Sequence, residues 1–100
     1  MEIKTTVEGT QATLEAEGKL TVNTSPDLTA AVEALPEEVC DVNIDLSKLD
    51  YIASAGLRVF VATEKLASAR GGALHLLHPV DDVMEVLEMT GLADVFDIVR

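Results

Sequence analysis

Apolar residues switch between two spacings along this chain of 100 residues, and the switch constrains the fold more than any single motif. Some segments carry them at every second position or in a short run, which is typical of strands. Others carry them every three or four positions, as on one side of a helix. The predicted strands are 3–7, 12–18, 39–46 and 73–77, and the predicted helices are 26–35, 55–69 and 79–90. A short final strand or turn is expected at 95–99.

The order of these segments predicts the fold class. Glu8-Gly9-Thr10 is a turn signal, so the first two strands should form a hairpin. The later strands alternate with helices, which implies crossover connections and partly parallel pairing. Tyr51-Ile52 should extend the third strand toward the second helix. We therefore expect an α/β fold, a mixed β-sheet with helices packed on it, in the order ββαβαβα with the short final strand after it.

Serine, proline and glycine mark the expected ends of the helices. Ser25 precedes Pro26, so the Ser25 hydroxyl is predicted to cap the first helix, and Pro36 should stop that helix. The pair Gly71-Gly72 should end the second helix, and Gly91 should end the third.

Length and charge exclude several classes of function. One hundred residues predict a single domain over 1–100, with one core and one shallow site. The net charge of −11 argues against binding to nucleic-acid phosphates or to anionic lipid, and it favours a partner with a basic patch. Cys40 is the one cysteine, which leaves no internal disulfide and no cysteine pair for zinc. Without a secretion signal or a long apolar run, we expect a soluble cytoplasmic protein.

The stretch Ile52-Ala53-Ser54-Ala55-Gly56 joins a strand-like to a helix-like segment, and Ser54 has three interpretations. As a helix cap, its hydroxyl would accept an N–H left free at the helix start. As a nucleophile, it would sit in a G-x-S-x-G turn, but isoleucine replaces the first glycine and the chain is too short for an α/β-hydrolase. As a modified residue, it would be reached by the active site of another protein. Judged on the local pattern alone, the cap is the favoured interpretation.

Capping does not account for the small residues around Ser54. Glycine in the first turn of a helix is unfavourable by about 1 kcal/mol relative to alanine, yet Gly56 falls there. Small neighbours leave the hydroxyl open to another protein. A phosphate on it would carry about two negative charges at a helix N-terminus, where free N–H groups and the macrodipole favour an anion.

The second predicted helix has a core side and a charged side. Its core side is expected to carry Val59, Phe60, Ala62, Thr63, Leu66 and Ala67. Leu57 and Val61 fall instead among charged residues such as Arg58, on the side toward which Ser54 projects. Two apolar residues beside an exposed serine suggest a contact patch, although single exposed apolar residues are common on any surface.

No other constellation predicts a catalytic or metal site. His75 and His78 would point to opposite faces of a strand, so they should not share a metal ion. Asp41, Asp45 and Asp50 lack the acidic pair and the late lysine of a phosphate-accepting receiver. Glycines are too few and wrongly spaced for a phosphate-binding or dinucleotide loop, so no cofactor is expected.

Four segments, in order, resemble the STAS domain of bacterial anti-sigma factor antagonists: GKLTVNTSPDL, DVNIDLSKLDYIASAGLRVF, GGALHLLHP and VLEMTGL. The likeness covers nearly the whole chain. It implies a mixed sheet backed by helices, in agreement with the predicted order. It also implies that the protein is not an enzyme but binds an anti-sigma factor that is itself a serine kinase. Phosphorylation of the serine at the strand–helix junction, here Ser54, would break that complex.

The helical pattern and the resemblance together predict a contact surface for the kinase. That surface would comprise Ala53, Ala55, Gly56, Leu57, Arg58 and Val61 around the serine, with Thr21 and Asn23 of the early segment. Many family members carry aspartate at the positions of Ala53 and Thr21. These two departures motivate a second hypothesis, a constitutive STAS subunit of a larger assembly, such as a lipid-transport complex or a stress-sensing particle. A small hydrolase using Ser54 is a third.

Overall fold

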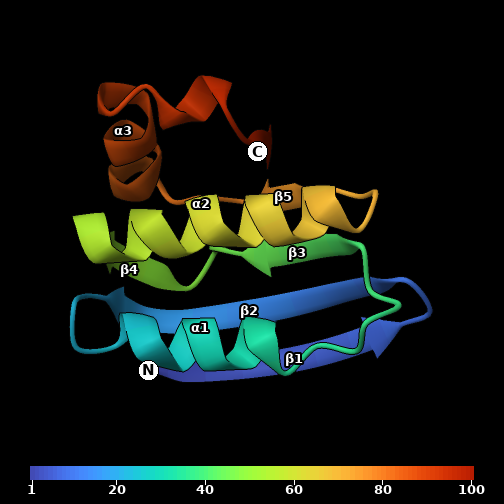
Figure 1. The fold of residues 1–100 in the computed structure, drawn as a ribbon. Helices are drawn as coiled ribbons and strands as arrows, with labels where there is room; N and C mark the ends of the chain where they lie inside the picture. The colour runs from blue at the N-terminus through green and yellow to red at the C-terminus, as the bar shows by residue number, and fades with distance from the viewer.

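A computed structural model describes residues 1–100 and contains one mixed sheet of six strands with three α-helices. The strands are β1 (Glu2–Glu8), β2 (Gln11–Leu20), β3 (Asp41–Asp45), β4 (Leu49–Ile52), β5 (Leu74–Leu77) and β6 (Asp97–Val99). The helices are α1 (Ser25–Glu33), α2 (Ser54–Ala69) and α3 (Asp81–Met89), and a 3-10 turn η1 (Leu92–Asp94) precedes β6. Helices α1 and α2 lie side by side on one face of the sheet (Figure 1). The predicted α/β class is confirmed.

Strand β2 organises the sheet because it pairs with three other strands. The strand order is β1-β2-β3-β5-β6, with β1 antiparallel to β2 and the remaining pairs parallel. The first half of β2 pairs with β3 and its last residues pair with β4. The register shifts between Gly18 and Lys19, where Gly18 has a φ of 109°. Glycine adopts this conformation without the penalty that other residues incur, so β2 can change partners there.

The prediction that Tyr51-Ile52 extends the third strand is wrong. The chain turns after β3, where the Ser47 N–H donates to a carboxylate oxygen of Asp45 at 2.9 Å and the Leu49 N–H donates to the Leu46 carbonyl at 3.1 Å. Residues 49–52 then form β4, which pairs with the end of β2 instead of continuing β3. In the sequence, this short polar turn between two apolar runs resembles an interruption of a single strand.

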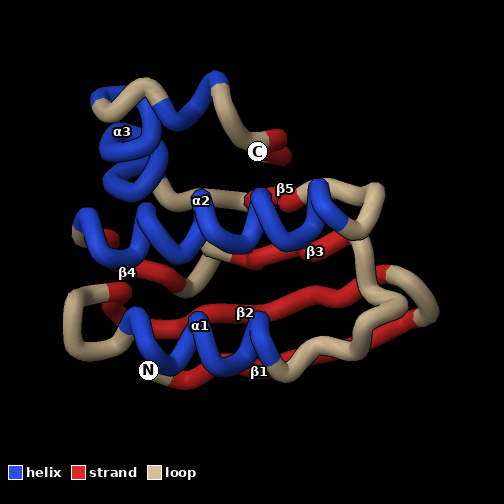
Figure 2. Tube along the Cα trace, viewed as in Figure 1, coloured by secondary structure: helices blue, strands red, loops and turns tan.

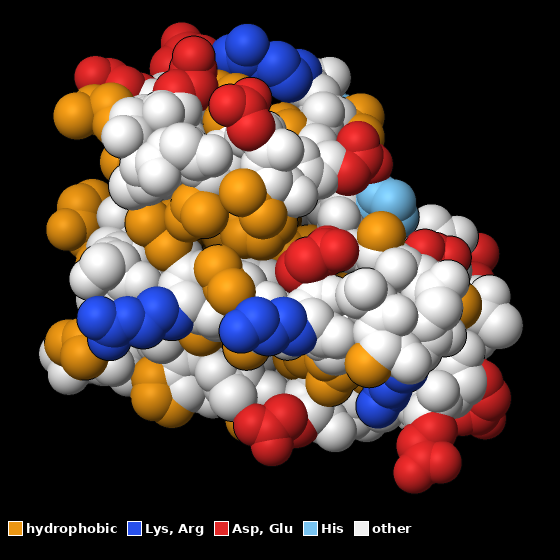
Figure 3. Space-filling model, turned by 45° about the horizontal axis from the view of Figure 1, so that its top comes forward, with side chains coloured by type: hydrophobic (Ala, Val, Ile, Leu, Met, Phe, Trp, Pro, Cys, Tyr) orange, Lys and Arg blue, Asp and Glu red, His pale blue; other side chains and the backbone are white.

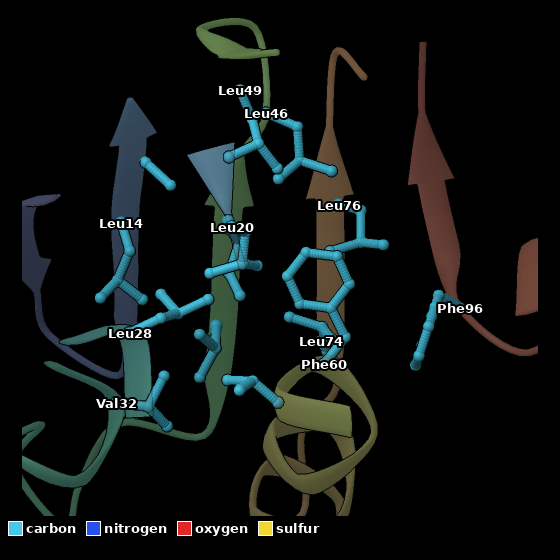
Figure 4. Close-up of a cluster of buried hydrophobic side chains, with 14 of the residues drawn as sticks. Leu14, Leu20, Leu28, Val32, Leu46, Leu49, Phe60, Leu74, Leu76 and Phe96 are labelled. Carbon is cyan, nitrogen blue, oxygen red and sulfur yellow. The ribbon is translucent and has the colours of Figure 1, made fainter. Parts of the chain in front are cut away.

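The core is one cluster of 23 buried residues between the sheet and its helices. Leu14 and Leu20 of β2 and Leu74 and Leu76 of β5 point toward α1 and α2 (Figure 4). Alternate residues of these strands therefore face the helices, as the period-two spacing predicted. No helix of the structure combines the length and apolarity needed to cross a bilayer.

The first helix begins differently from the prediction. Ser25 is its first residue, and the Ser25 hydroxyl donates backward to the carbonyl of Thr21 instead of accepting a free N–H. Thr24 occupies the N-cap position, and its hydroxyl accepts from the Thr21 N–H at 2.8 Å. The assignment of Ser25 as the cap is therefore wrong by one position, although the helix itself is confirmed.

Candidate functional site

The site is the junction at which β4 ends and α2 begins. The Ala53 N–H donates to the Leu20 carbonyl at 2.9 Å, which ties the junction to the end of β2. Ala53 has extended backbone angles (φ −100°, ψ 172°) and is the N-cap residue, so Ser54 is the first residue of α2. The parallel pairing of β2 with β4 thus fixes the place of Ser54 at the edge of the sheet.

The Ser54 side chain is exposed and its hydroxyl makes no hydrogen bond. The Ala53 carbonyl already accepts the N–H groups of Gly56 at 2.9 Å and Leu57 at 3.2 Å. The prediction that Ser54 caps the helix is therefore wrong, because Ser54 lies one position too far along. A serine hydroxyl with no structural partner is free to react without loss of a native contact.

The first turn of α2 offers an environment that suits an anion. The N–H groups of Ser54 and Ala55 have no partner within the helix, as is usual for the first residues of an α-helix. No acidic side chain lies in this turn. A phosphate on Ser54 would thus meet free N–H groups and the positive end of the helix dipole.

Gly56 is buried, and its lack of a side chain serves packing. A Cβ placed on Gly56 would lie 2.6 Å from Cγ and Cδ2 of Leu20 and 3.0 Å from Cγ1 of Ile52. Leu20 is fully buried, so it has little room to move. The sequence interpretation, that the small residues around Ser54 keep the hydroxyl open, therefore holds for the half-buried Ala53 and Ala55 but not for Gly56.

Leu57 is not an exposed contact residue, which corrects the predicted Leu57/Val61 patch. Only 8 % of Leu57 is exposed, and Val61 is half-buried against the core. The cluster that contains Leu57 also contains Val83, Met84 and Leu87 of α3. Helix α3 packs against β4, the strand that leads into α2. On the predicted core side, conversely, Ala62 is exposed and Leu66 is half-buried.

The loop after β2 lies beside the start of α2, although 30 residues separate them in the chain. The loops that precede α1 and α2 emerge at the same end of the molecule (Figure 2). Asn23 is exposed in this loop, and the hydroxyl oxygen of Thr21 accepts from the Asn23 N–H at 3.2 Å. The structure therefore brings Thr21 and Asn23 to the same edge as Ser54.

Comparison with known proteins assigns the family. A family model described as "Mlab, STAS domain" matches residues 3–100. The chain belongs to the STAS-domain family. This STAS domain is 35 % identical over 81 residues to the anti-sigma-B factor antagonist of Bacillus subtilis, an alignment that covers 81 % of the chain and 74 % of the relative. It is 27 % identical over 99 residues to the anti-sigma-B factor antagonist of Staphylococcus aureus, covering 98 % and 92 %.

Solved structures show the same fold for this STAS domain. A putative anti-sigma factor antagonist from Thermotoga maritima superposes with a TM-score of 0.89 at 22 % identity, covering 98 % of this chain and 86 % of the other. The anti-sigma factor antagonist SpoIIAA in its unphosphorylated form gives 0.84 at 18 % identity, covering 99 % and 89 %. The predicted family is confirmed, and it is a family of regulatory binding proteins.

Two exposed apolar side chains near the junction were not predicted from the sequence. Val22, in the loop after β2, is 72 % exposed, and Tyr51, in β4, is 50 % exposed. The Lys19 ammonium lies 6.0 Å from the centre of the Tyr51 ring. Two features of the sequence could have predicted their exposure. Val22 stands between two polar residues in a turn, and Tyr51 alternates with the buried Ile52 along the strand.

The surface of α2 beyond Ser54 is basic. Arg58 and Lys65 are exposed on it and neither forms an ion pair. Hydrophobic side chains gather between α2 and α3, with two basic side chains along one margin of this patch (Figure 3). Arg58 thus keeps its predicted place beside Ser54, since residues four apart share a helix face.

No histidine is placed to activate Ser54. His75 bonds instead to Asp97, with 2.6 Å between the imidazole Nδ1 and a carboxylate oxygen, and His78 is exposed just before α3. The serine–histidine–acid arrangement that the hydrolase hypothesis needs is not assembled around the junction. His78 lies just beyond β5 with a φ of 53°, so the strand alternation on which the prediction for the two histidines relied does not apply to it.

Proposed function

We propose that this STAS domain is an anti-sigma factor antagonist that binds a kinase-type anti-sigma factor and loses it when Ser54 is phosphorylated. The names of the relatives from B. subtilis and S. aureus support the role of antagonist. The observation that supports the switch is the exposed Ser54 hydroxyl, which has no hydrogen bond and stands at a helix N-terminus. Such a residue can exist with or without phosphate at little structural cost.

The proposed docking surface surrounds Ser54 at the edge of the sheet. It comprises the exposed side chains of Val22, Asn23, Tyr51 and Arg58 with the half-buried Thr21, Ala53, Ala55 and Val61. Gly56 and Leu57 support this surface from beneath, since both are buried. Apolar side chains with a polar margin are typical of a protein interface.

Release would follow from charge and desolvation, without a change of fold. Phosphate adds about two negative charges to a surface that a bound partner must strip of water. The resulting penalty falls on the complex alone, because the free protein keeps the phosphate in water.

The phosphorylation test uses the cognate kinase-type anti-sigma factor with ATP. Mass spectrometry of the product is expected to place a single phosphate on Ser54. Ser54→Ala should abolish the modification. Ser68→Ala changes another exposed serine of α2 and should leave the modification intact. Phosphate on any other residue, or none with any kinase encoded beside the gene, would refute the switch.

The binding test compares two equivalent charge insertions on α2. Ser54→Asp is expected to weaken the complex with the anti-sigma factor by at least about tenfold, or about 1.4 kcal/mol, since it leaves an uncompensated charge in the interface. Ser68→Asp, fourteen positions further along the helix, should leave the affinity unchanged. Equal affinities for wild type and Ser54→Asp, measured by titration calorimetry, would count against the mechanism.

A constitutive STAS subunit of a larger assembly is the second candidate. Two observations favour it: the matching family model is described as "Mlab, STAS domain", and Ala53 and Thr21 replace the aspartates of many family members. A subunit without a switch should be captured equally by its partners as wild type and as Ser54→Asp. Transporter genes beside this gene would support the subunit, and a gene for a kinase-type anti-sigma factor would support the switch.

A further inference from the structure

A histidine held between two carboxylates lies on the sheet face that α1 and α2 leave uncovered. His75 is the second residue of β5, with Asp41 on the neighbouring strand β3 and Asp97 on β6. Leu74 and Leu76, its neighbours in the chain, point the other way into the core. The cluster therefore joins three adjacent strands on the face opposite the helices.

Each ring nitrogen of His75 faces one carboxylate. Nδ1 lies 2.6 Å from Oδ2 of Asp97, and Nε2 lies 3.5 Å from Oδ1 of Asp41. A neutral imidazole has a single N–H, so it can donate to one of these carboxylates and must turn a lone pair toward the other. A protonated imidazole donates to both. The geometry therefore favours the charged form of His75.

We propose that protonation of His75 fastens β6 to the sheet, so that the C-terminal segment 92–100 is a latch controlled by pH. Strand β6 is three residues long and forms one edge of the sheet. Short edge elements open locally more readily than central strands. A charged contact between β5 and β6 therefore needs to stabilise the closed state only modestly to change how often β6 opens.

Other contacts also hold this segment. Strand β6 pairs with β5 over three residues, and Leu92, Ala93 and Ile98 pack against the core. The His78 N–H donates to the Val99 carbonyl at 2.6 Å, and this bond helps to hold His78 at a φ of 53°, which residues other than glycine rarely adopt. Phe96, just before β6, is buried edge-to-face against Phe60 of α2, with 6.2 Å between ring centres. Opening of the latch would release both contacts and uncover the edge of β5.

The direction of the pH effect follows from the groups that face His75. The hydrogen bond to Asp97 raises the pKa of His75, and Asp41 acts in the same direction, while burial opposes both. Asp45 lies on the same face of β3, the Cys40 thiol donates to Asp41, and the charged groups that act on the imidazole are Asp97 and Asp41. Because the folded-state pKa is the higher one, the contribution is complete below about pH 6.5, the ordinary histidine value. It is lost as pH rises through the raised pKa.

Hydrogen exchange of the His78 amide reports directly on the latch, because this N–H is bonded to β6. After correction for intrinsic exchange and normalisation to amides of β2, its protection is expected to be about two- to fivefold higher at pH 5.5 than at pH 8.5, the range for partly exposed ion pairs. His75→Gln should bring this ratio close to one. Asp97→Asn should do the same, since it removes the nearer carboxylate.

Asp94→Asn is the matched control. It removes one charge from the same segment at an exposed position in η1 and should leave the wild-type ratio intact. NMR titration of the His75 ring provides a second measurement, with a lower pKa expected in Asp97→Asn than in the wild type. A wild-type ratio of one, an unchanged ratio in His75→Gln, or an equal loss in Asp94→Asn would overturn the latch.

Discussion

Two strand-to-helix junctions stand side by side at one edge of this sheet, and they use their hydroxyls in opposite ways. At the junction of β2 and α1, Thr24 accepts from the Thr21 N–H at 2.8 Å and donates to the Lys19 carbonyl at 2.7 Å. Ser25 adds a bond to the Thr21 carbonyl. At the junction of β4 and α2, no side chain contributes a hydrogen bond, and Ser54 is left free.

The comparison separates a structural serine from an available one. Ser25 is buried and bonded, so any change to it acts first on stability. Ser54 is exposed and unbonded, so a change to it acts first on what the surface can bind. The cost of leaving α2 without a side-chain cap, about 1 kcal/mol, is compatible with a site that must remain chemically accessible.

The largest effect is expected where the second junction touches the core. Gly56→Val should lower the free energy of unfolding by about 3 kcal/mol, because the new side chain overlaps the buried Leu20 and Ile52. Urea denaturation measures the change. Ala62→Val, at an exposed position of the same helix, is the control and should cost about 0.5 kcal/mol or less. Equal midpoints for both variants would contradict the packing role of Gly56.

The first junction should be broken by removing its central hydroxyl. Thr24→Val keeps the shape of the side chain but loses the hydrogen bonds of the Thr24 hydroxyl to Thr21 and to the Lys19 carbonyl, which should cost about 1.5 kcal/mol. Thr29→Val, within α1, tests whether valine itself is responsible, since no hydrogen bond of the Thr29 hydroxyl is present. Equal losses of thermal stability in the two variants would show that the Thr24 hydroxyl does not stabilise the first junction.

The second junction should be strengthened by supplying the missing cap. Ala53→Asp places a carboxylate at the N-cap of α2, where it can accept from the free N–H groups of the first turn, and should stabilise the protein by about 1 kcal/mol. Ala53→Asn provides the same cap without charge. An unchanged urea midpoint in both variants would show that the junction cannot accommodate a cap.

The smallest changes in stability are expected when the two serines are replaced by alanine, and these changes compare the two junctions directly. Ser54→Ala should change the free energy of unfolding by no more than about 0.5 kcal/mol, because no hydrogen bond is lost. Ser25→Ala should cost about 1 kcal/mol, because the bond to Thr21 disappears. Parallel urea titrations compare the two alanines. A larger loss at Ser54 than at Ser25 would reverse the assignment of roles.

Local patterns along the chain were enough to predict most of the strands and helices. Alternating residues such as Ala12 and Leu14 identified β2, and the glycines after α2 and α3 identified where those helices end, with Gly71 at φ 87° and Gly91 at φ 77°. The same patterns also placed Ser54 at the strand–helix junction. These features depend on neighbours in the chain, so a pattern within a few turns or residues suffices to predict them.

Which surfaces remain open depends on contacts between distant parts of the chain. Leu57 is buried in a core that also includes residues of α3, more than 20 positions later, and no pattern within α2 can reveal such distant packing. Gly56 is explained by Leu20, which lies 36 residues earlier in the chain. The hydroxyl of Ser54 is free because Ala53, held in place by the pairing of β4 with β2, occupies the N-cap position. Helix α2 therefore begins one residue before the position at which Ser54 could cap it. Long-range packing, not local propensity, therefore makes this serine available.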